Sequence, residues 1–552
     1  MNDHTQGYPP QFTDSSVRRT CFSRSYLSVA LTCVVIISLM LCTACGGKGP
    51  SIPSLSVKAP ELDGGKDWLN TTRPLKLSEL KGKVVLLDFW NLSCVNCFHT
   101  IPILKALEER YPNELVIIGI HSPKYSSERD TKLLREAALR MEMDHPIIND
   151  AEDQLWNAYG VKGYPTIVLI DPNGGLVKMM IGERTYSQLD KQVKQLIDQY
   201  KKDGQIDEKP LTFTKERSRI KDTPLFFPEK LCVDPKRKML FIADSGHNRI
   251  VVTDLAGKLL NVIGTGRIGA QDGPYAGAEF HHPRGLTIDD DNLYVADTQN
   301  QKIRKVDLKK QIVSTVSGDG QLTEILGPPE LGKAKDVRLN SPWDLVVAKN
   351  KIYIAMAGSH QLYLLDLASN DMSVFAGSGT EELHDGPLLE ADLAQPSGIA
   401  FGDNKIYFTD SESNSIRTAD IDRRIGKVKT LTGKGLEDFG DIDGTFVKAF
   451  LQHPLGVAVA GKKIYVADTL NHKIKALDLD SKMVSTVWGS GKPGDADGEY
   501  PQFNEPNGIA YDGQKNLYIA DTNNNAIKVG NLQTGMVSTL KITGLTAPVK
   551  AN

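Results

Sequence analysis

The sequence predicts a multidomain protein in which an α/β domain is followed by an all-β propeller of six blades. Two observations lead to this prediction. A buried-strand pattern at Val84–Leu87 runs into a Cys-x-x-Cys pair and a helical pattern, and strands then alternate with helices to about residue 200. From Pro224 onward the chain repeats itself, and each copy holds four short alternating runs separated by turns.

Composition is that of an ordinary soluble protein long enough for several domains. The chain has 552 residues, 40% hydrophobic and 24% charged, with a net charge of −3. No Lys/Arg cluster is interleaved with aromatic residues, so we expect no nucleic-acid partner.

The N-terminus predicts an export signal. Arg18, Arg19 and Arg24 precede the apolar segment 27–41, which as a helix would span about 22 Å, short of the ~30 Å bilayer core. The following Cys-Thr-Ala-Cys resembles a bacterial lipobox, although cysteine stands where leucine is preferred, and Cys45 is then the lipidated residue. We therefore expect a membrane-anchored, extracytoplasmic protein of the bacterial cell envelope. Cleavage without lipid and retention as an uncleaved anchor are the alternatives.

Changes in composition divide the chain into five parts. They are a signal peptide at 1–45, a Gly/Pro/Ser tether at 46–56, the α/β domain at 57–203, a charged linker at 204–223 and the propeller at 224–545.

Within the α/β domain the hydrophobic periodicity predicts four strands and four helices. The expected strands are Val84–Leu87, Leu115–Ile120, Ile167–Ile170 and Leu176–Ile181, and the expected helices follow Cys97 or cover Lys132–Met141, Asp150–Tyr159 and Tyr186–Tyr200.

The chemistry of the domain centres on Cys94 and Cys97 at the junction of a strand and a helix. Unpaired N–H groups and the helix dipole favour a thiolate at the first cysteine, which makes Cys94 the expected nucleophile. Cys97 lies one turn further into the helix and is placed to resolve a mixed disulfide. We expect His99 and His121 to serve in packing rather than in acid–base chemistry.

The surrounding residues resemble the thioredoxin superfamily. Asp88 and Trp90 stand in the Asp-Phe-Trp phrase before the pair, Pro102 follows it, and a Gly-Tyr-Pro-Thr phrase contains Pro165. The resemblance implies that Asp88 is a buried carboxylate that takes the proton of Cys97. It also implies that Pro165 follows a cis peptide bond in a loop facing the disulfide.

The sequence departs from thioredoxin between the cysteines, where Val95-Asn96 replaces Gly-Pro, and at Ser93, where thioredoxin has tryptophan. Such changes tune the potential over roughly −270 to −120 mV, so the direction of electron flow stays open. A structural disulfide and a zinc half-site are the alternatives, but Cys232 is the one other cysteine of the folded part. The expected redox group is the Cys94–Cys97 disulfide, with no metal and no other cofactor.

The repeats begin at prolines 228, 283, 342, 396, 454 and 506, and their Leu-Tyr-Val-Ala-Asp-Thr phrase resembles the NHL repeat. We expect the recurring aspartate to cap the turn that follows it. Met356 replaces it in the third blade, which we therefore expect to be irregular. A recurring Asp-Gly turn is followed by an apolar residue expected to fill the joint between blades: Phe280, Leu393, Leu451 or Phe503.

The order of the two domains resembles the family of NHL repeat-containing protein 2 and its bacterial relatives. The resemblance implies a thiol–disulfide oxidoreductase that acts on protein thiols and disulfides, with a propeller that binds an unidentified protein. A redox-inert envelope scaffold acting through its propeller is the alternative function. A peroxidase-like redoxin is disfavoured because those enzymes lack a closely spaced cysteine pair.

Overall fold

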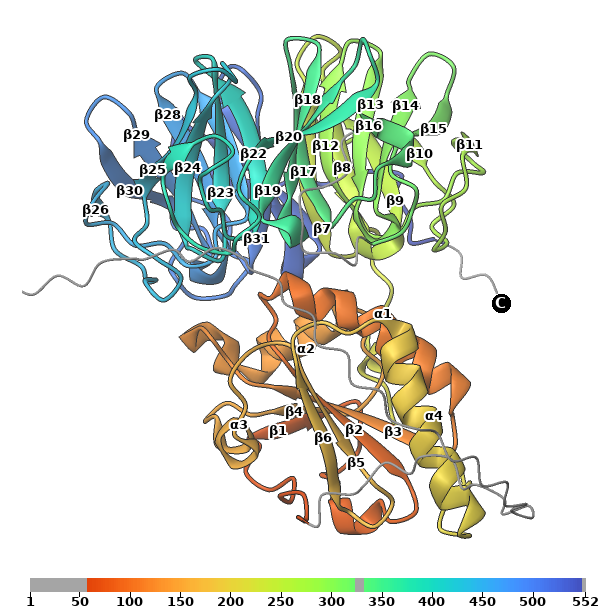
Figure 1. Cartoon of the computed structure of the whole chain (residues 1–552). Helices are drawn as coiled ribbons and strands as arrows, with labels where there is room; N and C mark the ends of the chain where they lie inside the picture. The colour runs from red at the N-terminus through yellow and green to blue at the C-terminus, as the bar shows by residue number, and fades with distance from the viewer. Residues whose placement is uncertain (1–56, 323–331, 549–552) are drawn as a thin grey trace, which may run out of the picture. The chain divides into compact units, whose positions relative to one another are not determined.

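The α/β domain is built on one six-stranded sheet, shown in the red-to-yellow part of Figure 1, with the strand order β1-β4-β3-β2-β5-β6. A computed structural model of the chain describes residues 57–322 and 332–548. The predicted signal peptide, Cys45 and the tether at 46–56 lie outside these residues. Among the described residues no helix is both long and apolar enough to cross a membrane.

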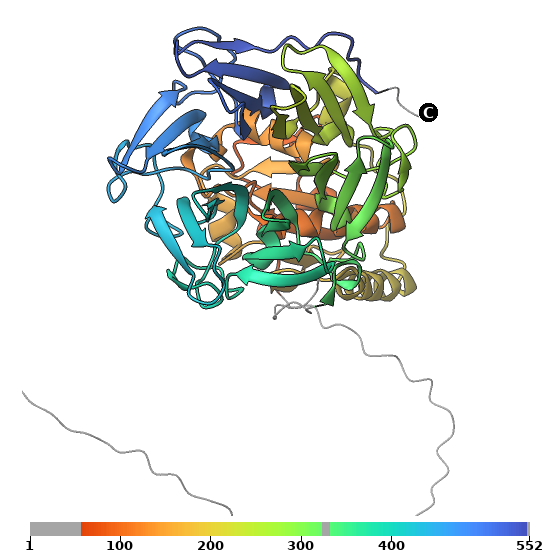
Figure 2. The same ribbon diagram turned by 90° about the horizontal axis from the view of Figure 1, so that it is seen from above.

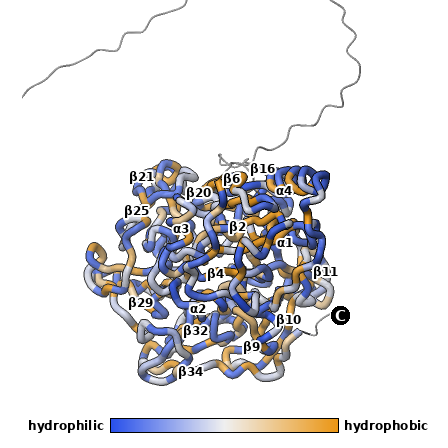
Figure 3. The backbone as a smooth tube through the Cα atoms, turned by 90° about the horizontal axis from the view of Figure 1, so that it is seen from below, coloured by the Kyte–Doolittle hydropathy of each residue, from blue (hydrophilic) through white to orange (hydrophobic). Residues whose placement is uncertain are grey.

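The strands of this sheet are β1 (Asp67–Leu69), β2 (Val84–Trp90), β3 (Leu115–His121), β4 (Ile147–Asn149), β5 (Thr166–Ile170) and β6 (Leu176–Ile181). Every residue of β2 is buried, because helices or loops cover both faces of this central strand. In Figure 3 the tube around β2 is predominantly hydrophobic. β2 runs parallel to β3 and antiparallel to β5, and its carboxyl end leads directly to the cysteine pair.

The helices are α1 (Val95–Arg110), α2 (Thr131–Arg140), α3 (Gln154–Tyr159) and α4 (Tyr186–Lys202). α3 begins four residues later than expected. The Asp150 carboxylate accepts hydrogen bonds from the N–H groups of Leu155 and Trp156, at 2.9 and 2.8 Å, and so holds the chain outside the helix. β1 and β4 were not predicted, because three residues are too few for a periodic pattern.

The rest of the chain forms a six-bladed propeller, confirming the predicted architecture, and Figure 2 shows the blades arranged around a central axis. The four main strands of each blade, from the inside out, are β7 (Pro228–Asp234), β8 (Met239–Asp244), β9 (Arg249–Asp254) and β10 (Leu259–Ile263); β12 (Pro283–Asp289), β13 (Asn292–Asp297), β14 (Lys302–Asp307) and β15 (Ile312–Ser317); β17 (Pro342–Ala348), β18 (Lys351–Met356), β19 (Gln361–Asp366) and β20 (Asp371–Ala376); β22 (Pro396–Gly402), β23 (Lys405–Asp410), β24 (Ser415–Asp420) and β25 (Lys427–Thr432); β27 (Gly456–Ala460), β28 (Lys463–Asp468), β29 (Lys473–Asp478) and β30 (Met483–Trp488); and β31 (Pro506–Tyr511), β32 (Asn516–Asp521), β33 (Ala526–Asn531) and β34 (Val537–Thr539).

The Asp-Gly phrases do more than turn the chain, because four blades carry a fifth, outer strand of two residues that starts at or near them. These strands are β11 (Gly273–Pro274), β16 (Gly332–Lys333), β21 (Gly386–Pro387) and β26 (Gly444–Thr445). The apolar residues predicted to fill the joints are 0 or 1% exposed. Phe280, for example, packs with Phe241 of the first blade and Val295 of the second.

The ring closes between the last blade and the first. The Thr522 hydroxyl donates to the Pro228 carbonyl at 2.8 Å, and the chain after β34 pairs with the first blade through the Leu259 N–H and the Thr543 carbonyl, at 3.1 Å. Closure hides sheet edges that a linear array would expose.

The repeated aspartates hold a different partner from the one predicted. None of them caps the short turn that follows it. Asp297 accepts instead from the backbone N–H of His281, two residues before the proline of its own blade, at 2.8 Å. The equivalent bonds in the other blades join Asp244 to Phe226, Asp410 to Ala394, Asp468 to Gln452 and Asp521 to Asn504. The aspartates therefore fix the chain entering each inner strand.

The third blade is regular, which corrects the expectation based on Met356. Its sheet has the order β16-β20-β19-β18-β17, as in its neighbours, and the same register shift at the start of its inner strand. Met356 is fully buried in an apolar cluster with Tyr363, so packing replaces the polar contact.

Candidate functional site

The two cysteines lie at the N-terminus of α1. Cys94 is the N-cap residue, half-buried, and its carbonyl accepts the N–H of Cys97 at 3.1 Å. Both are free thiols, and Cys97 is 1% exposed. Burial raises the pKa of the Cys97 thiol well above its usual value, and the neighbouring Cys94 and Asp88 raise it further. Cys97 therefore needs a base before it can act as a nucleophile.

Asp88 is placed to be that base. It lies on β2, is fully buried, and neither carboxylate oxygen has a hydrogen-bond partner among the described residues. Burial raises the pKa of Asp88 to about 7, although the charge of the nearby His145 works against the shift. At neutral pH the carboxyl group can consequently both take and release a proton.

Trp90 and His121 pack beneath the pair. Trp90 is 1% exposed, and its ring meets that of His121 edge-on with the centroids 5.0 Å apart. Burial lowers the pKa of His121 to about 3, so the imidazole is neutral at physiological pH and serves in packing.

The proline loop has the geometry that the thioredoxin resemblance implies, since the Tyr164–Pro165 peptide bond is cis. The Tyr164 hydroxyl donates to the Ser122 carbonyl at 2.8 Å. Its ring packs against the apolar cluster that contains Cys94 and Cys97, which places the loop beside the pair.

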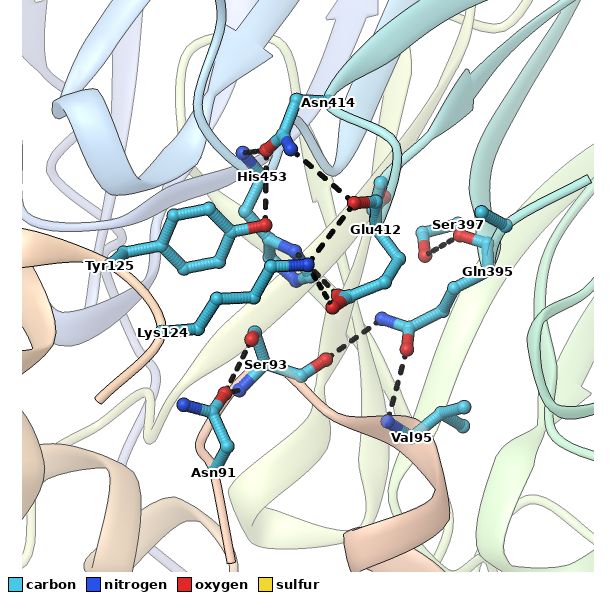
Figure 4. A network of polar contacts seen from close by, with 12 residues as sticks. Asn91, Ser93, Val95, Lys124, Tyr125, Gln395, Ser397, Glu412, Asn414 and His453 are labelled. Atoms are coloured by element: carbon cyan, nitrogen blue, oxygen red, sulfur yellow. Dashed lines mark hydrogen bonds and ion pairs between the residues drawn. The ribbon is translucent and has the colours of Figure 1, made fainter. Parts of the chain in front are cut away.

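The propeller covers the same end of α1. The described residues of both domains belong to one compact unit. As Figure 4 shows, the Gln395 side chain donates to the Ser93 carbonyl at 2.9 Å and accepts the Val95 N–H at 3.0 Å. Leu470 and Phe439 of the propeller join the apolar cluster around the cysteines. Any partner of Cys94 would therefore meet propeller residues as well.

Six residues, one from each blade, make contact with the α/β domain, and we call them the pre-proline ring because each directly precedes the first proline of its blade. They are Phe227, His282, Ser341, Gln395, His453 and Glu505. All six have positive φ, between 46° and 61°. Each backbone N–H donates to a side chain of the preceding blade, with Asn525 of the last blade serving Phe227 of the first. The turns are thus held rigidly in place.

The contacts of the ring are chemically diverse. The Ser341 hydroxyl meets His99 Nε2 at 2.6 Å, and the other nitrogen of that imidazole meets Glu183 at 2.8 Å. His99 therefore links the two domains rather than simply packing. Glu505 pairs with Arg140 at 2.8 Å. Phe227 packs with Leu139, His453 packs on the Tyr125 ring, and His282 Nε2 lies 3.9 Å from a Glu142 oxygen.

Beside the ring lies a buried interdomain ion pair. Lys124 Nζ is 2.5 Å from Glu412 Oε1, with both side chains 14% exposed, and the Tyr125 hydroxyl donates to Asn414 at 3.0 Å (Figure 4). The sequence analysis did not predict this interface. Its signal was the position before each proline, which differs in type among the repeats although the flanking residues recur.

Comparisons with known proteins agree with this architecture. Residues 82–176 match the thioredoxin-like family and residues 503–529 the NHL repeat. NHL repeat-containing protein 2 of Gallus gallus is 38% identical over 88% of this chain and 71% of that protein. Protein SUPPRESSOR OF QUENCHING 1, chloroplastic, of Arabidopsis thaliana is 39% identical over 89% of this chain and 48% of that protein. Thiol-disulfide oxidoreductase YkuV of Bacillus subtilis is 28% identical over 25% of this chain and 93% of that protein.

Proposed function

The chain belongs to the family of NHL repeat-containing protein 2, and from this premise we propose that it is a thiol–disulfide oxidoreductase acting on protein thiols and disulfides. The observation that carries the proposal is the arrangement of Cys94 at the helix N-terminus, Cys97 buried one turn away, and Asp88 with its raised pKa beside them. Thiol-disulfide oxidoreductases among the relatives of the α/β domain support it.

In the reducing direction the Cys94 thiolate attacks one sulfur of a substrate disulfide. This forms a mixed disulfide and releases the other substrate sulfur as a thiolate, which takes up a proton from water. Cys97 then gives its proton to Asp88 and attacks the Cys94 sulfur. The second substrate thiolate leaves, the Cys94–Cys97 disulfide forms, and an external dithiol returns the pair to the reduced state. The oxidising direction is the reverse of these steps.

We further propose that the propeller helps to select the substrate. Ser93 and Val95, which flank Cys94, both bond to Gln395, so an incoming protein must displace or adapt to this contact. The proposed partner is a protein whose disulfide or thiol reaches Cys94 beside the Pro165 loop, with its flanking surface on the propeller.

The proposed location is the bacterial cell envelope, outside the cytoplasm, with a lipid on Cys45 as the membrane anchor. The basic and apolar N-terminal segment and the lipobox-like phrase support this location. The full chain and a Cys45→Ser variant should be expressed in a bacterial host and fractionated. We expect the full chain in the membrane fraction with an acylated N-terminal peptide, and the variant without the lipid. An unmodified Cys45 in the membrane fraction would instead indicate an uncleaved anchor.

The reaction is tested by the reduction potential of the Cys94–Cys97 pair, measured in the whole chain by equilibration with glutathione buffers. A potential between roughly −270 and −120 mV is expected for an exchange enzyme. The Cys97→Ser variant should trap protein partners as mixed disulfides, which a reductant releases. Cys232→Ser is the matched control, because burial raises the pKa of the Cys232 thiol to about 12 and its loss should change neither result.

A redox-inert scaffold is the second candidate function. The docking of Gln395 over the residues flanking Cys94 favours it, because this contact restricts access to the pair. A potential below about −300 mV, together with no trapped partner, would identify a structural disulfide and support the scaffold.

A further inference from the structure

We propose that Glu142, His281 and His282 form a binding site for a divalent transition metal, with Zn²⁺ the best match, that bridges the two domains. Glu142 follows α2 of the α/β domain, whereas the histidines directly precede β12 of the propeller. One ligand atom from each of the three residues lies within 4.8 Å of the other two. The site is separate from the cysteine chemistry and does not depend on the proposed oxidoreductase activity.

The backbone holds both histidines in place while their rings stay available. The His281 N–H donates to Asp297 and the His282 N–H to Asn248, each at 2.8 Å. No hydrogen bond joins either imidazole to any residue that the structure describes. Glu142 and both rings line a cavity of about 180 Å³, which leaves room for a water molecule as a further ligand.

The histidines are in the protonation state that a metal needs. Burial lowers the pKa of His281 to about 4, with the neighbouring His282 adding to the shift. Burial, with Arg284 and Arg140, lowers the pKa of His282 to about 3. Both imidazoles are therefore neutral at pH 7 and offer lone pairs without first losing a proton.

The spacing fits metal ligands better than an ion pair. His282 Nε2 and Glu142 Oε1 are 3.9 Å apart, too far for a hydrogen bond. Two ligands of one tetrahedral Zn²⁺, bound at about 2.0–2.1 Å, lie about 3.3 Å apart. A side-chain movement of about half an ångström would bring these atoms to that separation. Two imidazoles and one carboxylate suit zinc, whereas Ca²⁺ and Mg²⁺ prefer oxygen ligands alone.

The positive charges around the cavity are mostly neutralised. Arg140 pairs with Glu505 at 2.8 Å, and Arg284 with Glu229 at 3.1 Å. Lys105, which also lines the cavity, is exposed and screened by solvent. These contacts reduce the repulsion that a cation would meet.

The repeat itself does not explain the histidine pair. The two residues before the proline are Phe-Phe, Asn-Ser, Ala-Gln, Gln-His and Asn-Glu in the other blades. The second blade alone has two histidines there, and it alone faces Glu142. The sequence analysis expected no metal site, because the carboxylate and the histidines are 139 positions apart in the chain and meet only when the domains dock.

The test is zinc binding by the chain from Gly46 onward carrying Cys94→Ser and Cys97→Ser, so that the two active-site thiols cannot take the metal. Zinc chloride is titrated in competition with a chromophoric chelator, and bound metal is counted by mass spectrometry. We expect one equivalent of zinc. Glu142→Gln, which keeps the shape of the side chain, and His281→Ala should each weaken binding at least roughly 100-fold, because each removes a ligand.

His384→Ala is the matched control, since that histidine is 63% exposed on another blade, and its zinc affinity should equal that of the parent. Cobalt chloride supplies a second readout: visible absorption typical of four or five ligands in the parent and its loss in Glu142→Gln. Zinc should also raise the melting temperature of the parent and not of Glu142→Gln. No bound zinc in the parent, or equal binding by Glu142→Gln, would overturn the proposal.

Discussion

Gln395 of the fourth blade accepts a hydrogen bond from Val95, the first residue of α1, at 3.0 Å. The same side chain donates to the Ser93 carbonyl at 2.9 Å. One propeller amide thus satisfies the backbone on both sides of Cys94. It also removes from the helix N-terminus a donor that would otherwise face the Cys94 sulfur or a substrate.

Removing this amide should expose the cysteine pair. We expect Gln395→Ala to increase several-fold the rate at which Cys94 reacts with a bulky maleimide, because the propeller no longer holds the flanking backbone. The lost hydrogen bonds should cost about 1–2 kcal/mol of unfolding free energy. Stopped-flow alkylation and urea denaturation measure the two effects.

Gln361→Ala is the control for this prediction. Gln361 is equally buried, but its amide donates to the Gly377 carbonyl of its own blade. It should lower the stability without changing the alkylation rate. Equal alkylation rates for Gln395→Ala and the parent would show that the interdomain contact does not limit access.

Asp88 should make stability depend on pH. Its folded pKa is about 7, against an ordinary value of 3.8, so folding favours the protonated form. This stabilising contribution is complete below about pH 3.8 and is lost as the pH rises through 7. We therefore expect Asp88→Asn to match the parent near pH 4 and to exceed it by roughly 4 kcal/mol at pH 8.

The measurement is urea denaturation of both proteins between pH 4 and pH 8. Asp198→Asn is the control, because that carboxylate is 53% exposed and its replacement should leave the pH profile unchanged. Parallel profiles for Asp88→Asn and the parent would mean that the buried carboxyl has an ordinary pKa.

The sequence predicted the architecture because both domains are written in local patterns. The buried run at β2 and the proline-spaced repeats need no long-range information. The interface could not be predicted in the same way. Glu142 and His282, like Lys124 and Glu412, belong to different domains, so their proximity depends on docking rather than on periodicity. The partner of the repeated aspartate was mistaken because the nearest turn was assumed to need its carboxylate.

The ion pair of Lys124 and Glu412 should be strongly coupled. Both side chains are 14% exposed, so Lys124→Met leaves an uncompensated buried carboxylate at a cost of about 3–5 kcal/mol. Glu412→Gln should cost a similar amount, and the double variant less than the sum. Lys194→Met, in an ion pair whose partners are 52% and 53% exposed, should leave the midpoint of denaturation unchanged. Additive losses in the double-mutant cycle would refute the coupling.

The third blade offers a test of how the repeat is stabilised. In the second blade Asp297 pairs with Arg304 at 2.6 Å, and in the fourth blade Asp410 pairs with Arg417 at 2.8 Å, all four side chains being fully buried. The cation stands seven residues after the aspartate in both blades. In the third blade this pair of positions holds Met356 and Tyr363, so the aspartate and its cation are replaced together.

Restoring one charge should therefore harm the blade, and restoring both should repair it. We expect Met356→Asp to cost at least about 3 kcal/mol, because it buries a carboxylate with no cation beside it. Adding Tyr363→Arg should recover a substantial part of that loss by supplying the missing partner, as in the fourth blade. Urea denaturation of the two single variants and the double variant measures the coupling energy. If the double variant loses as much as the two single variants combined, the blade is held by apolar packing that cannot accommodate the ion pair, and the joint replacement of Met356 and Tyr363 reflects shape rather than charge.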